Sequence, residues 1–446
     1  MKFVRVPLLL SIITCIIPLN VLSSHETHTI NVDTHQILNR LPPEFISIGL
    51  DSRQARVHWR AFHWNKAIEY ARPLARAFLR FGGNDADRLW FQRGRRRKLK
   101  MKPHGQRLHR TSQQEFLSGL RRADPRNFTM NQPNSFYHNY NYSVAGDRLA
   151  EDYRTLRKRL NQFAIFNHSI MIGPSTTQPN KPATIGYIKK FISANGCRWI
   201  NAITFHQSSS YYVNSRTTSL EQFTDGEILD ELLPELLTMR NLTESNPHCH
   251  GIPIWIGETA SAYGGGAENL SDTYVAGFMW LDKIGMSARE GLQTIVRQSF
   301  YGGHYALLRQ RTMQPNPDYW LTLLLKRLLN ENVVSVNGDV TRDVRFYATT
   351  NSSRTLLYGM NLSNVTIGVR LAIEGRTLTT GSHRTDIFIY APTNNDLQSR
   401  TVMLNDRKIH RHQDPNHLDL ASFAKTVTKW PVHVPAKRIV FFIVHT

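Results

Sequence analysis

Extended apolar segments alternate with helical patterns over most of the first 330 residues, and this alternation limits the fold more than any other feature. Strand-like segments occupy 44–51, 76–83, 127–132, 169–175, 200–207, 252–259 and 294–303. Helical patterns occupy 146–164, 183–195, 219–240, 271–288 and 317–329. Several strand-like segments are apolar almost throughout, as strands covered on both faces are. The alternation predicts a parallel α/β fold and fits a (β/α)8 TIM barrel, with chemistry at the C-terminal strand ends.

A second pattern begins near residue 332, where strand-like runs such as "TLLYGMNL" and "RIVFFIVHT" are separated only by turns. This pattern predicts an all-β domain of the sandwich type. We therefore expect a leader over 1–24, a barrel over 25–331 and a β-sandwich over 332–446, and the first residues of the barrel segment can pair with the sandwich.

The barrel prediction meets one difficulty, because the segment 84–130 is too short for the strand–helix units that a full barrel needs there. We expect a barrel that is shortened in this region. An evolved loss and an incomplete gene model would both explain the shortening, and the sequence does not separate them.

The first 24 residues have the layout of a secretory signal, with basic Lys2 and Arg5, an apolar stretch, and small residues at Ser23 and Ser24. Pro18 and Asn20 interrupt the apolar stretch, so a membrane anchor is the less favoured alternative. No other stretch is long and apolar enough to be a transmembrane span. We expect a secreted protein, extracellular or lysosomal. Glycosylation sequons agree with this, at Asn127, Asn141, Asn167, Asn241, Asn269, Asn351, Asn361 and Asn364.

The chain is strongly basic, with a net charge of +21 and a pI near 10.1. Outside the cell such a protein meets sulfated glycans, anionic surfaces or released nucleic acid. Nucleic acid is not expected as a partner, because no helix-turn-helix, zinc-finger or RNA-binding motif is present.

Two cysteines, Cys197 and Cys249, remain beyond the leader. Each stands just before an apolar strand-like run, so parallel neighbouring strands would place both at the same end of the sheet. An even pair in an oxidising compartment can form a disulfide, but the sequence does not decide whether this pair does.

The stretch "WIGETASAYGGG" at 255–266 carries the sharpest chemical signal. An apolar strand delivers Glu258 at its end, and a glycine loop follows that can let backbone N–H groups approach a ligand closely. A strand ending in a surface glutamate is the plain alternative. A second carboxyl would change that, because retaining glycosidases use two carboxyls about 5 to 5.5 Å apart. An earlier strand ends in "NQPNS" at 131–135, but there Gln132 stands where the second carboxyl would be needed.

Motifs in the same order along the chain resemble the heparanase family, glycoside hydrolase family 79. They are "LRFGG", "NQPNSF", "GPSTTQPNK", "TFHQ", "IGETASAYGGG", "LSDTYVAGFMWLDKIGMSAR", "RQSFYGG" and "NPDYW". The resemblance implies a (β/α)8 barrel with a β-sandwich domain. It also implies a retaining endo-β-glucuronidase that cleaves heparan sulfate and needs no metal or organic cofactor.

The resemblance also implies roles for single residues. Glu258 matches the nucleophile, Gln132 occupies the place of the acid/base glutamate, and Asn131 matches the amide that holds the sugar's 2-hydroxyl. Further residues match positions that line the substrate site, namely His206, Tyr263, Gly264, Gly265, Gln298 and Tyr305. A buried core histidine is the alternative for His206.

Basic residues are expected to complete the glycan site. Lys181, Lys189 and Lys190 match a heparin-binding cluster of the family, and a solvated helix face is the alternative. The run 93–110 has nine Lys or Arg and no acid, and includes Arg95, Arg96 and Arg97. This run could bind sulfates through arginine forks, be removed by proteolytic processing, or be a solvated loop.

Gln132 decides between two functional hypotheses, because a glutamine amide cannot protonate the glycosidic oxygen. The first is a heparanase-like retaining hydrolase with impaired catalysis on heparan sulfate. The second is a catalytically inactive heparan sulfate-binding protein on the same scaffold. In both, the expected partners are heparan sulfate or heparin-like glycans on cell-surface or matrix proteoglycans, which could also hold the protein at the membrane surface.

Overall fold

The computed structural model describes residues 26–51, 63–82, 144–164, 166–207, 212–410 and 413–445. The leader, the expected strand 127–132 and the basic run 93–110 lie outside the described residues. The same holds for five predicted site residues, namely Asn131, Gln132, Arg95, Arg96 and Arg97. Within the described ranges, no helix combines the length and the apolarity needed to cross a bilayer.

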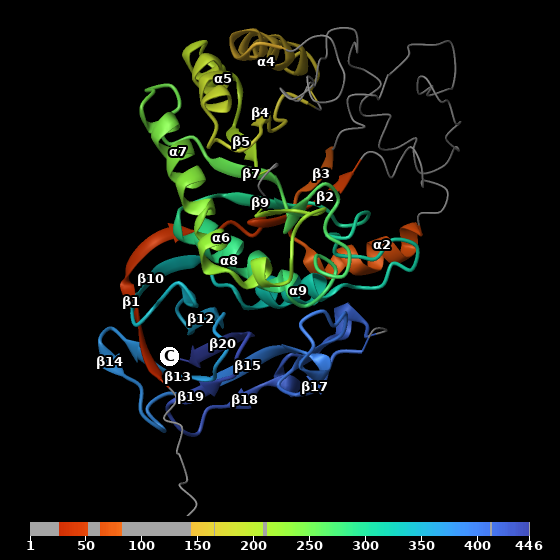
Figure 1. The fold of residues 1–446 in the computed structure, drawn as a ribbon. Helices are drawn as coiled ribbons and strands as arrows, with labels where there is room; N and C mark the ends of the chain where they lie inside the picture. The colour runs from red at the N-terminus through yellow and green to blue at the C-terminus, as the bar shows by residue number, and fades with distance from the viewer. Residues whose placement is uncertain are drawn as a thin grey trace, which may run out of the picture.

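In the described part of the chain, six parallel strands form the sheet of the barrel (Figure 1), in the order β3-β2-β9-β7-β5-β4. They are β2 (Ile46–Asp51), β3 (Leu79–Gly82), β4 (Ile172–Thr176), β5 (Ala202–His206), β7 (Ile254–Thr259) and β9 (Thr294–Arg297). The first of these along the chain, β2, pairs with the last, β9, as strands of a closing barrel do. The order ends at β3 and β4, and most of the chain between them, 83–143, lies outside the described residues.

The helices of the barrel segment agree with most of the predicted ranges. They are α2 (Trp64–Ala71), α4 (Gly146–Leu160), α5 (Pro182–Ser193), α6 (Gly226–Asp230), α7 (Leu232–Glu244), α8 (Ala276–Arg289) and α9 (Pro317–Leu328). Short 3-10 turns complete them as η2 (Arg72–Leu74), η6 (Gly196–Trp199) and η7 (Glu221–Thr224). A minor pair of strands, β6 (Val213–Asn214) and β8 (Ala262–Tyr263), lies beside the barrel sheet.

The predictions differ from the structure at three places. The segment 219–240 is not one helix but η7, α6 and α7, because the Asp225 carboxylate accepts the Glu227 N–H and starts a new helix there. Helix α8 begins at Ala276 rather than 271, since the Ser271 hydroxyl accepts the Ala267 N–H in a turn. The predicted strand 294–303 ends at Arg297.

The second domain is all β, as its sequence pattern predicts. Its strands are β10 (Asn332–Gly338), β11 (Val344–Thr350), β12 (Arg354–Asn361), β13 (Ile367–Ile373), β14 (Arg376–Thr377), β15 (Thr385–Pro392), β16 (Val402–Leu404), β17 (Arg407–Lys408), β18 (Lys425–Thr426), β19 (Val432–Val434) and β20 (Arg438–His445). Short 3-10 turns lie between them as η8 (Thr393–Asn395), η9 (Pro415–His417) and η10 (Ala421–Phe423). The N-terminal strand β1 (Thr27–Arg40) joins this sheet, antiparallel to β10 and parallel to β13.

The central strands of this domain are apolar on both faces because each face packs against a different core. In β20, Val440 and Phe442 belong to the interior of the second domain, whereas the alternate residues Ile439 and Phe441 join the core shared with the barrel. Strand side chains alternate between the two faces of a sheet, so the continuous apolar run "RIVFFIV" follows from burial on both sides. Helices α8 and α9 lie between the barrel sheet and this domain (Figure 1).

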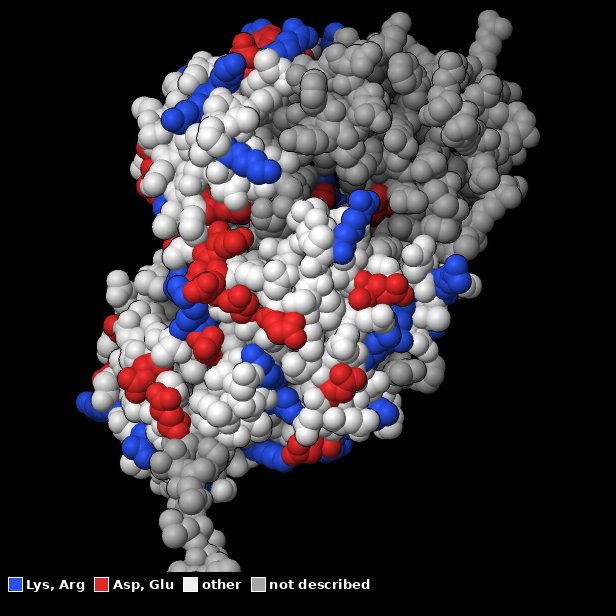
Figure 2. Space-filling view, viewed as in Figure 1, with Lys and Arg blue, Asp and Glu red and all other residues white. Residues whose placement is uncertain are grey.

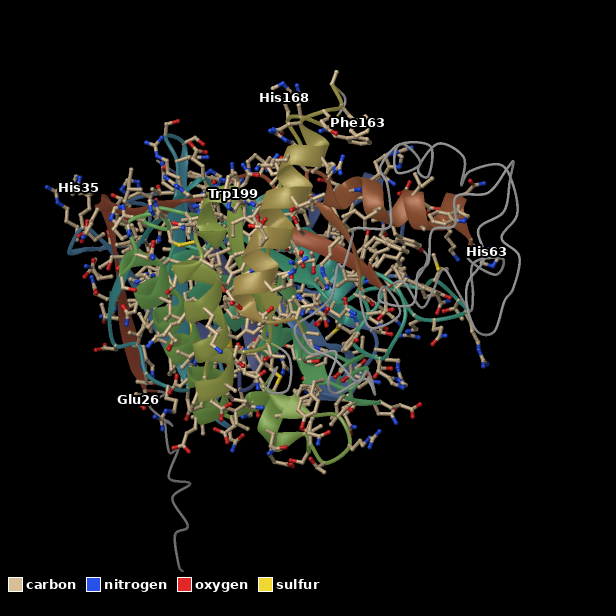
Figure 3. The ribbon with its side chains drawn as sticks, turned by 90° about the horizontal axis from the view of Figure 1, so that it is seen from above. Glu26, His35, His63, Phe163, His168 and Trp199 are labelled. Atoms are coloured by element: carbon tan, nitrogen blue, oxygen red, sulfur yellow. A yellow bond between two sulfur atoms is a disulfide. The ribbon has the colours of Figure 1, made fainter. Side chains whose placement is uncertain are left out.

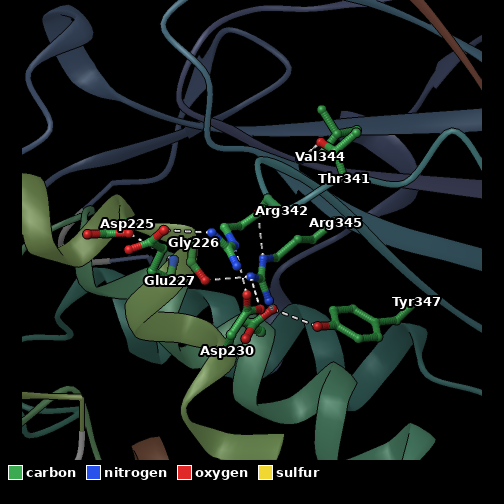
Figure 4. Close-up of polar contacts among 10 residues, drawn as sticks. Asp225, Gly226, Glu227, Asp230, Thr341, Arg342, Val344, Arg345 and Tyr347 are labelled. Carbon is green, nitrogen blue, oxygen red and sulfur yellow. Dashed lines mark hydrogen bonds and ion pairs between the residues drawn. The ribbon is translucent and has the colours of Figure 1, made fainter.

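Ion pairs join the two domains beside α8. The Arg345 guanidinium donates to Asp230 and also to the buried Asp282 carboxylate, which accepts the Tyr347 hydroxyl at 2.6 Å. Arg342 donates to Glu227 at 2.7 Å and to Asp230 at 2.9 Å (Figure 4). Arginines of the second domain therefore hold acids of α6 and α8, which fixes how the sandwich sits under the barrel.

Cys197 and Cys249 form a disulfide, with an S–S distance of 2.00 Å. Cys197 lies in η6 before β5, and Cys249 lies in the turn before β7. Because β5 and β7 are parallel neighbours, the bond links the N-terminal ends of two strands whose opposite ends carry His206 and Glu258.

Candidate active site

Glu258 lies near the C-terminal end of β7, where its side chain forms an ion pair with Arg80 of β3. Arg80 Nη1 donates to Glu258 Oε2 at 2.8 Å, and the two side chains are 17% and 15% exposed. Gly82 makes room for this guanidinium, since a Cβ there would lie 2.7 Å from Arg80 Cζ. The carboxylate is thus oriented by a positive charge but still reachable from solvent.

His206 ends β5, the neighbouring strand, and is buried beside the same carboxylate. Its Nδ1 lies 3.7 Å from Glu258 Oε2. Burial lowers the pKa of His206 to about 4, with Arg80 acting in the same direction and Glu258 opposing it. The imidazole is therefore neutral near pH 7 and can orient Glu258 or a ligand without adding charge.

The glycine loop follows β8 and reaches the same end of the barrel. Gly264, Gly265 and Gly266 have φ angles of +85°, +103° and +86°, which favour glycine. Gly265 accepts the His304 N–H at 2.7 Å, and a Cβ on Gly266 would lie 2.4 Å from the Tyr305 nitrogen. The loop is therefore held tightly against the segment that carries Tyr305.

Gln298 and Tyr305 lie together with Asp51, which ends β2. Gln298 Nε2 donates to Asp51 Oδ2 at 3.4 Å, and Gln298 also hydrogen-bonds Tyr305. Burial raises the pKa of Tyr305, and the charges of Glu258 and Asp51 add to this effect, so the phenol stays protonated. The structure thus gathers Glu258, His206, Gln298, Tyr305 and the glycine loop at one end of the sheet.

Sequence reasoning missed two charged members of this group, Arg80 and Asp51. Both stand at or near the ends of strands that were predicted, in "RAFLRFGG" and "EFISIGLD". A strand-end position was the signal that could have found them, because parallel strands bring their C-terminal ends together.

A buried lysine supports the strand end behind Glu258. Lys283 of α8 donates to Thr259 Oγ1 at 2.6 Å and to the Ala260 carbonyl at 2.8 Å. Thr259 in turn donates to Gln207 Oε1 at 2.9 Å, next to His206. These bonds tie the segments that follow Glu258 and His206 to one fixed point inside the molecule.

The predicted basic residues lie on α5 and the loop before it. Lys181 precedes α5, on the loop that leaves the C-terminal end of β4, so it lies at the same end of the sheet as Glu258. Lys189 and Lys190 are exposed farther along the helix. Across the described ranges, no group of three or more His, Cys, Asp or Glu side chains is arranged to hold a metal ion.

Comparisons with known proteins agree with this geometry. Residues 137–285 match the model of the family described as "Glycosyl hydrolase family 79, N-terminal domain". The chain is 36% identical over 296 residues to heparanase from Gallus gallus, covering 64% of this chain and 54% of that protein. It is 31% identical over 229 residues to inactive heparanase-2 from Homo sapiens, covering 49% of this chain and 38% of that protein. The chain thus spans about half the length of the heparanases it matches, or less.

Among solved structures, an α-L-arabinofuranosidase from Thermotoga maritima has a TM-score of 0.66. The alignment covers 94% of this chain and 100% of that one at 11% sequence identity. Such a likeness concerns the fold alone, and it confirms the predicted TIM barrel with a β-sandwich domain.

Proposed function

We propose that this chain, whose residues 137–285 match the model of glycosyl hydrolase family 79, is a heparanase-like protein that binds heparan sulfate outside the cell, in a cleft over Glu258. Glu258 is the nucleophile of a retaining mechanism in this proposal. The observation that carries it is the half-buried carboxylate at a barrel strand end, paired with Arg80 and flanked by His206. The glycine loop, Gln298 and Tyr305 supply hydrogen-bonding groups for the sugar around it.

The chemistry assigned to Glu258 is attack on the anomeric carbon of a uronic acid. One carboxylate oxygen forms a bond to this carbon, the bond to the leaving oxygen breaks, and the resulting glycosyl ester is later hydrolysed by water. Arg80 holds the attacking group in one orientation, and the neutral His206 limits its other rotamers. Positioning of this kind is a large part of enzymatic rate enhancement.

Gln132 limits this reaction, because the leaving sugar oxygen needs a proton that an amide cannot give. General acid catalysis contributes roughly 10²- to 10⁴-fold in rate, and the same group would activate water in the second step. We therefore infer that heparan sulfate is bound in the cleft but hydrolysed slowly.

Restoring the acid tests this inference. Gln132→Glu should raise the rate of heparan sulfate cleavage by about 10²-fold or more. Gln222→Glu, which makes the same change at an exposed position of η7, is the matched control and should leave the rate unchanged. Wild-type turnover typical of an active glycosidase would contradict the assignment of Gln132.

The nucleophile is tested with a substrate that needs no acid. A 2-deoxy-2-fluoro-glucuronyl fluoride loses fluoride without protonation, and its C2 fluorine slows hydrolysis of the ester that forms. Intact-mass and peptide mass spectrometry should find one glycosyl unit attached to Glu258, and none in Glu258→Gln. Labelling at another residue, or none in the wild type, would reject Glu258 as the nucleophile.

A second candidate function is a non-catalytic heparan sulfate binder on this scaffold. Gln132 favours it, as does the similarity to a relative whose name marks it as inactive. If Gln132→Glu gains no hydrolysis and the fluoride does not label Glu258 while heparin binding is kept, the binder is the better description.

A further inference from the structure

A polar pocket lies at the end of the barrel opposite Glu258. Its volume is about 320 Å³, and it opens between the loop before β4 and the loop before β5. It is lined by Arg157, Asn167, His168, Ser169, Arg198, Trp199, Ile200 and Asn201. No carboxylate is among these lining residues, although two arginines and a histidine are.

Arg157, in the last turn of α4, is held in a fixed orientation in this pocket. Its guanidinium donates to the Ser169 carbonyl at 2.9 Å and to Asn201 Oδ1 at 2.8 Å. Asn201 Oδ1 also accepts the Met171 N–H at 2.9 Å, so the amide that orients the arginine is itself fixed. A guanidinium held by neutral acceptors keeps its full charge for a ligand, unlike one neutralised by a carboxylate.

Further cationic groups surround this arginine. Arg198 and His168 are exposed at the pocket, and Lys158 and Arg159 are exposed beside it in the last turn of α4. Trp199 is half-buried in the pocket wall, and Figure 3 shows His168 beyond the end of α4 and Trp199 beside the helix. Figure 2 shows Lys and Arg side chains gathered over α4 and α5, whereas Asp and Glu cross the middle of that face.

The pocket and the cleft are too far apart to hold the same few sugars. Asn201 immediately precedes β5, and His206 ends it beside Glu258. A strand rises about 3.3 Å per residue, so these two positions lie roughly 16 Å apart across the sheet. A ligand in the pocket must therefore be a second segment or a second chain of any glycan bound in the cleft.

We propose that this pocket, which we call the α4 pocket, is a second binding site for sulfated glycans. Arg157 and Arg198 bind sulfate through their planar N–H groups, the Asn201 amide contacts a sugar hydroxyl, and the Trp199 ring packs against a sugar face. Arginine forks match the geometry of oxyanions, and aromatic rings offer an apolar surface to sugars. The choice of glycan as partner rests on the proposed function.

Two sites at opposite ends of one barrel give the protein a bivalent character. Once the cleft or the α4 pocket holds one part of a long glycan network, the other site meets a high local concentration of the same polymer. The protein would then remain on a glycan surface, or join two chains, even when the cleft is slow to hydrolyse what it holds.

The test measures heparin affinity at a series of salt concentrations for three forms of the full chain, namely a background form and two charge variants made in it. Arg198→Glu reverses one exposed charge at the α4 pocket. Arg376→Glu makes the same change on the exposed strand β14 and is the control. Asn167 starts a sequon, so all three forms carry Asn167→Gln to keep an attached glycan out of the pocket.

Arg198→Glu should weaken heparin binding about tenfold at 0.15 M salt. It should also lower the slope of log affinity against log salt concentration by about one, because binding a polyanion releases its counterions, as it does for nucleic-acid phosphates. Arg376→Glu should change affinity less than twofold. Equal effects of the two variants would overturn the proposal, as would a background form that does not bind heparin. Unchanged thermal midpoints confirm that each variant is folded.

Two further measurements distinguish an effect at the α4 pocket from an effect at Glu258 and from general binding of polyanions. Labelling of Glu258 by the glucuronyl fluoride should be the same in Arg198→Glu, so loss of the α4 pocket and loss of the proposed function give different outcomes. An unsulfated polymer of the same backbone should not distinguish the two charge variants. If a single-stranded oligonucleotide distinguishes them as strongly as heparin does, the pocket is a general polyanion site and the glycan assignment is wrong.

Discussion

Two arginine–carboxylate pairs in the same barrel differ in where they lie and in what they can do. Arg297 and Asp318 join β9 to the start of α9 at 2.7 Å, with side chains only 1% and 2% exposed. The Arg297 guanidinium also donates to the Tyr305 carbonyl and lies 4.7 Å from the Trp280 ring. Arg80 and Glu258 form a pair of similar length at the strand ends, with side chains that are 17% and 15% exposed.

The comparison shows that the surroundings, not the pair itself, separate a structural ion pair from a reactive one. Arg297 and Asp318 are buried away from solvent, so their interaction can contribute only to stability. Glu258 keeps an accessible face, so its carboxylate can form a new bond while Arg80 holds it. Matched substitutions at the two pairs test this distinction.

The largest expected effect is on the buried pair. Asp318→Asn should lower the free energy of unfolding by about 3–5 kcal/mol, because it leaves a buried guanidinium without its counter-charge. The same carboxylate-to-amide change in Glu258→Gln should cost about 1 kcal/mol or less, since the Arg80 side chain keeps a solvent-exposed part. Chemical denaturation measures both, and equal costs would contradict the comparison.

A third carboxylate, Glu235 of α7, is buried and forms no ion pair with an arginine among the described residues. Asn180 donates to it at 3.2 Å, and burial raises the pKa of Glu235 to about 8, with Glu231 acting in the same direction and Lys283 opposing. The folded state therefore keeps a proton that the unfolded state loses above its usual pKa of 4.5. The stability contributed by this group is present below that pKa and is lost as the pH rises to about 8.

Glu235→Gln should remove this pH dependence. The variant should be more stable than the wild type by on the order of 2 kcal/mol at pH 8, with little difference at pH 4. Thermal or chemical unfolding at a series of pH values measures it. A difference that does not grow with pH would mean that Glu235 is ionised in the folded protein.

The hydrogen bonds from Lys283 to Thr259 and Ala260 predict a smaller effect on stability, together with an effect on the rate of Glu258 labelling. Thr259→Val removes the hydroxyl that accepts from Lys283 and donates to Gln207, which should cost about 1–3 kcal/mol of stability. It should also slow labelling of Glu258 about tenfold by loosening its position, an effect equivalent to about 1.4 kcal/mol. Thr259→Ser keeps the hydroxyl and should restore the labelling rate. Equal labelling rates in the Val and Ser variants would show that the hydrogen bonds of Thr259 contribute only to stability.

The smallest expected effect on stability is at Arg80. Arg80→Met should change the free energy of unfolding by about 1 kcal/mol or less, because both side chains of the pair are partly exposed to solvent. Its effect on labelling of Glu258 should be larger, about tenfold or more, since the attacking carboxylate loses its orienting partner. A large loss of stability with unchanged labelling would place Arg80 with Arg297, as a structural arginine.

Much of this molecule was readable from the sequence, for a local reason. Apolar runs such as "IPIWIGET" report burial on both faces, and burial of that kind is what a barrel strand needs. The strand-end position of Glu258 followed directly, as did the change to an all-β pattern near residue 332. These features depend on near neighbours in the chain, so composition and periodicity suffice to find them.

Only the tertiary structure decided which distant groups meet. Arg80 and Glu258 are 178 residues apart, and β1 pairs with β10 and β13 some 300 residues away. The Cys197–Cys249 bond and the α4 pocket likewise depend on packing between segments that the chain order does not bring together. Hydrophobic periodicity indicates on which side of a strand or helix a residue lies, but it does not indicate which distant residue it contacts. That partner is fixed by strand order and by the packing of both domains around α8 and α9.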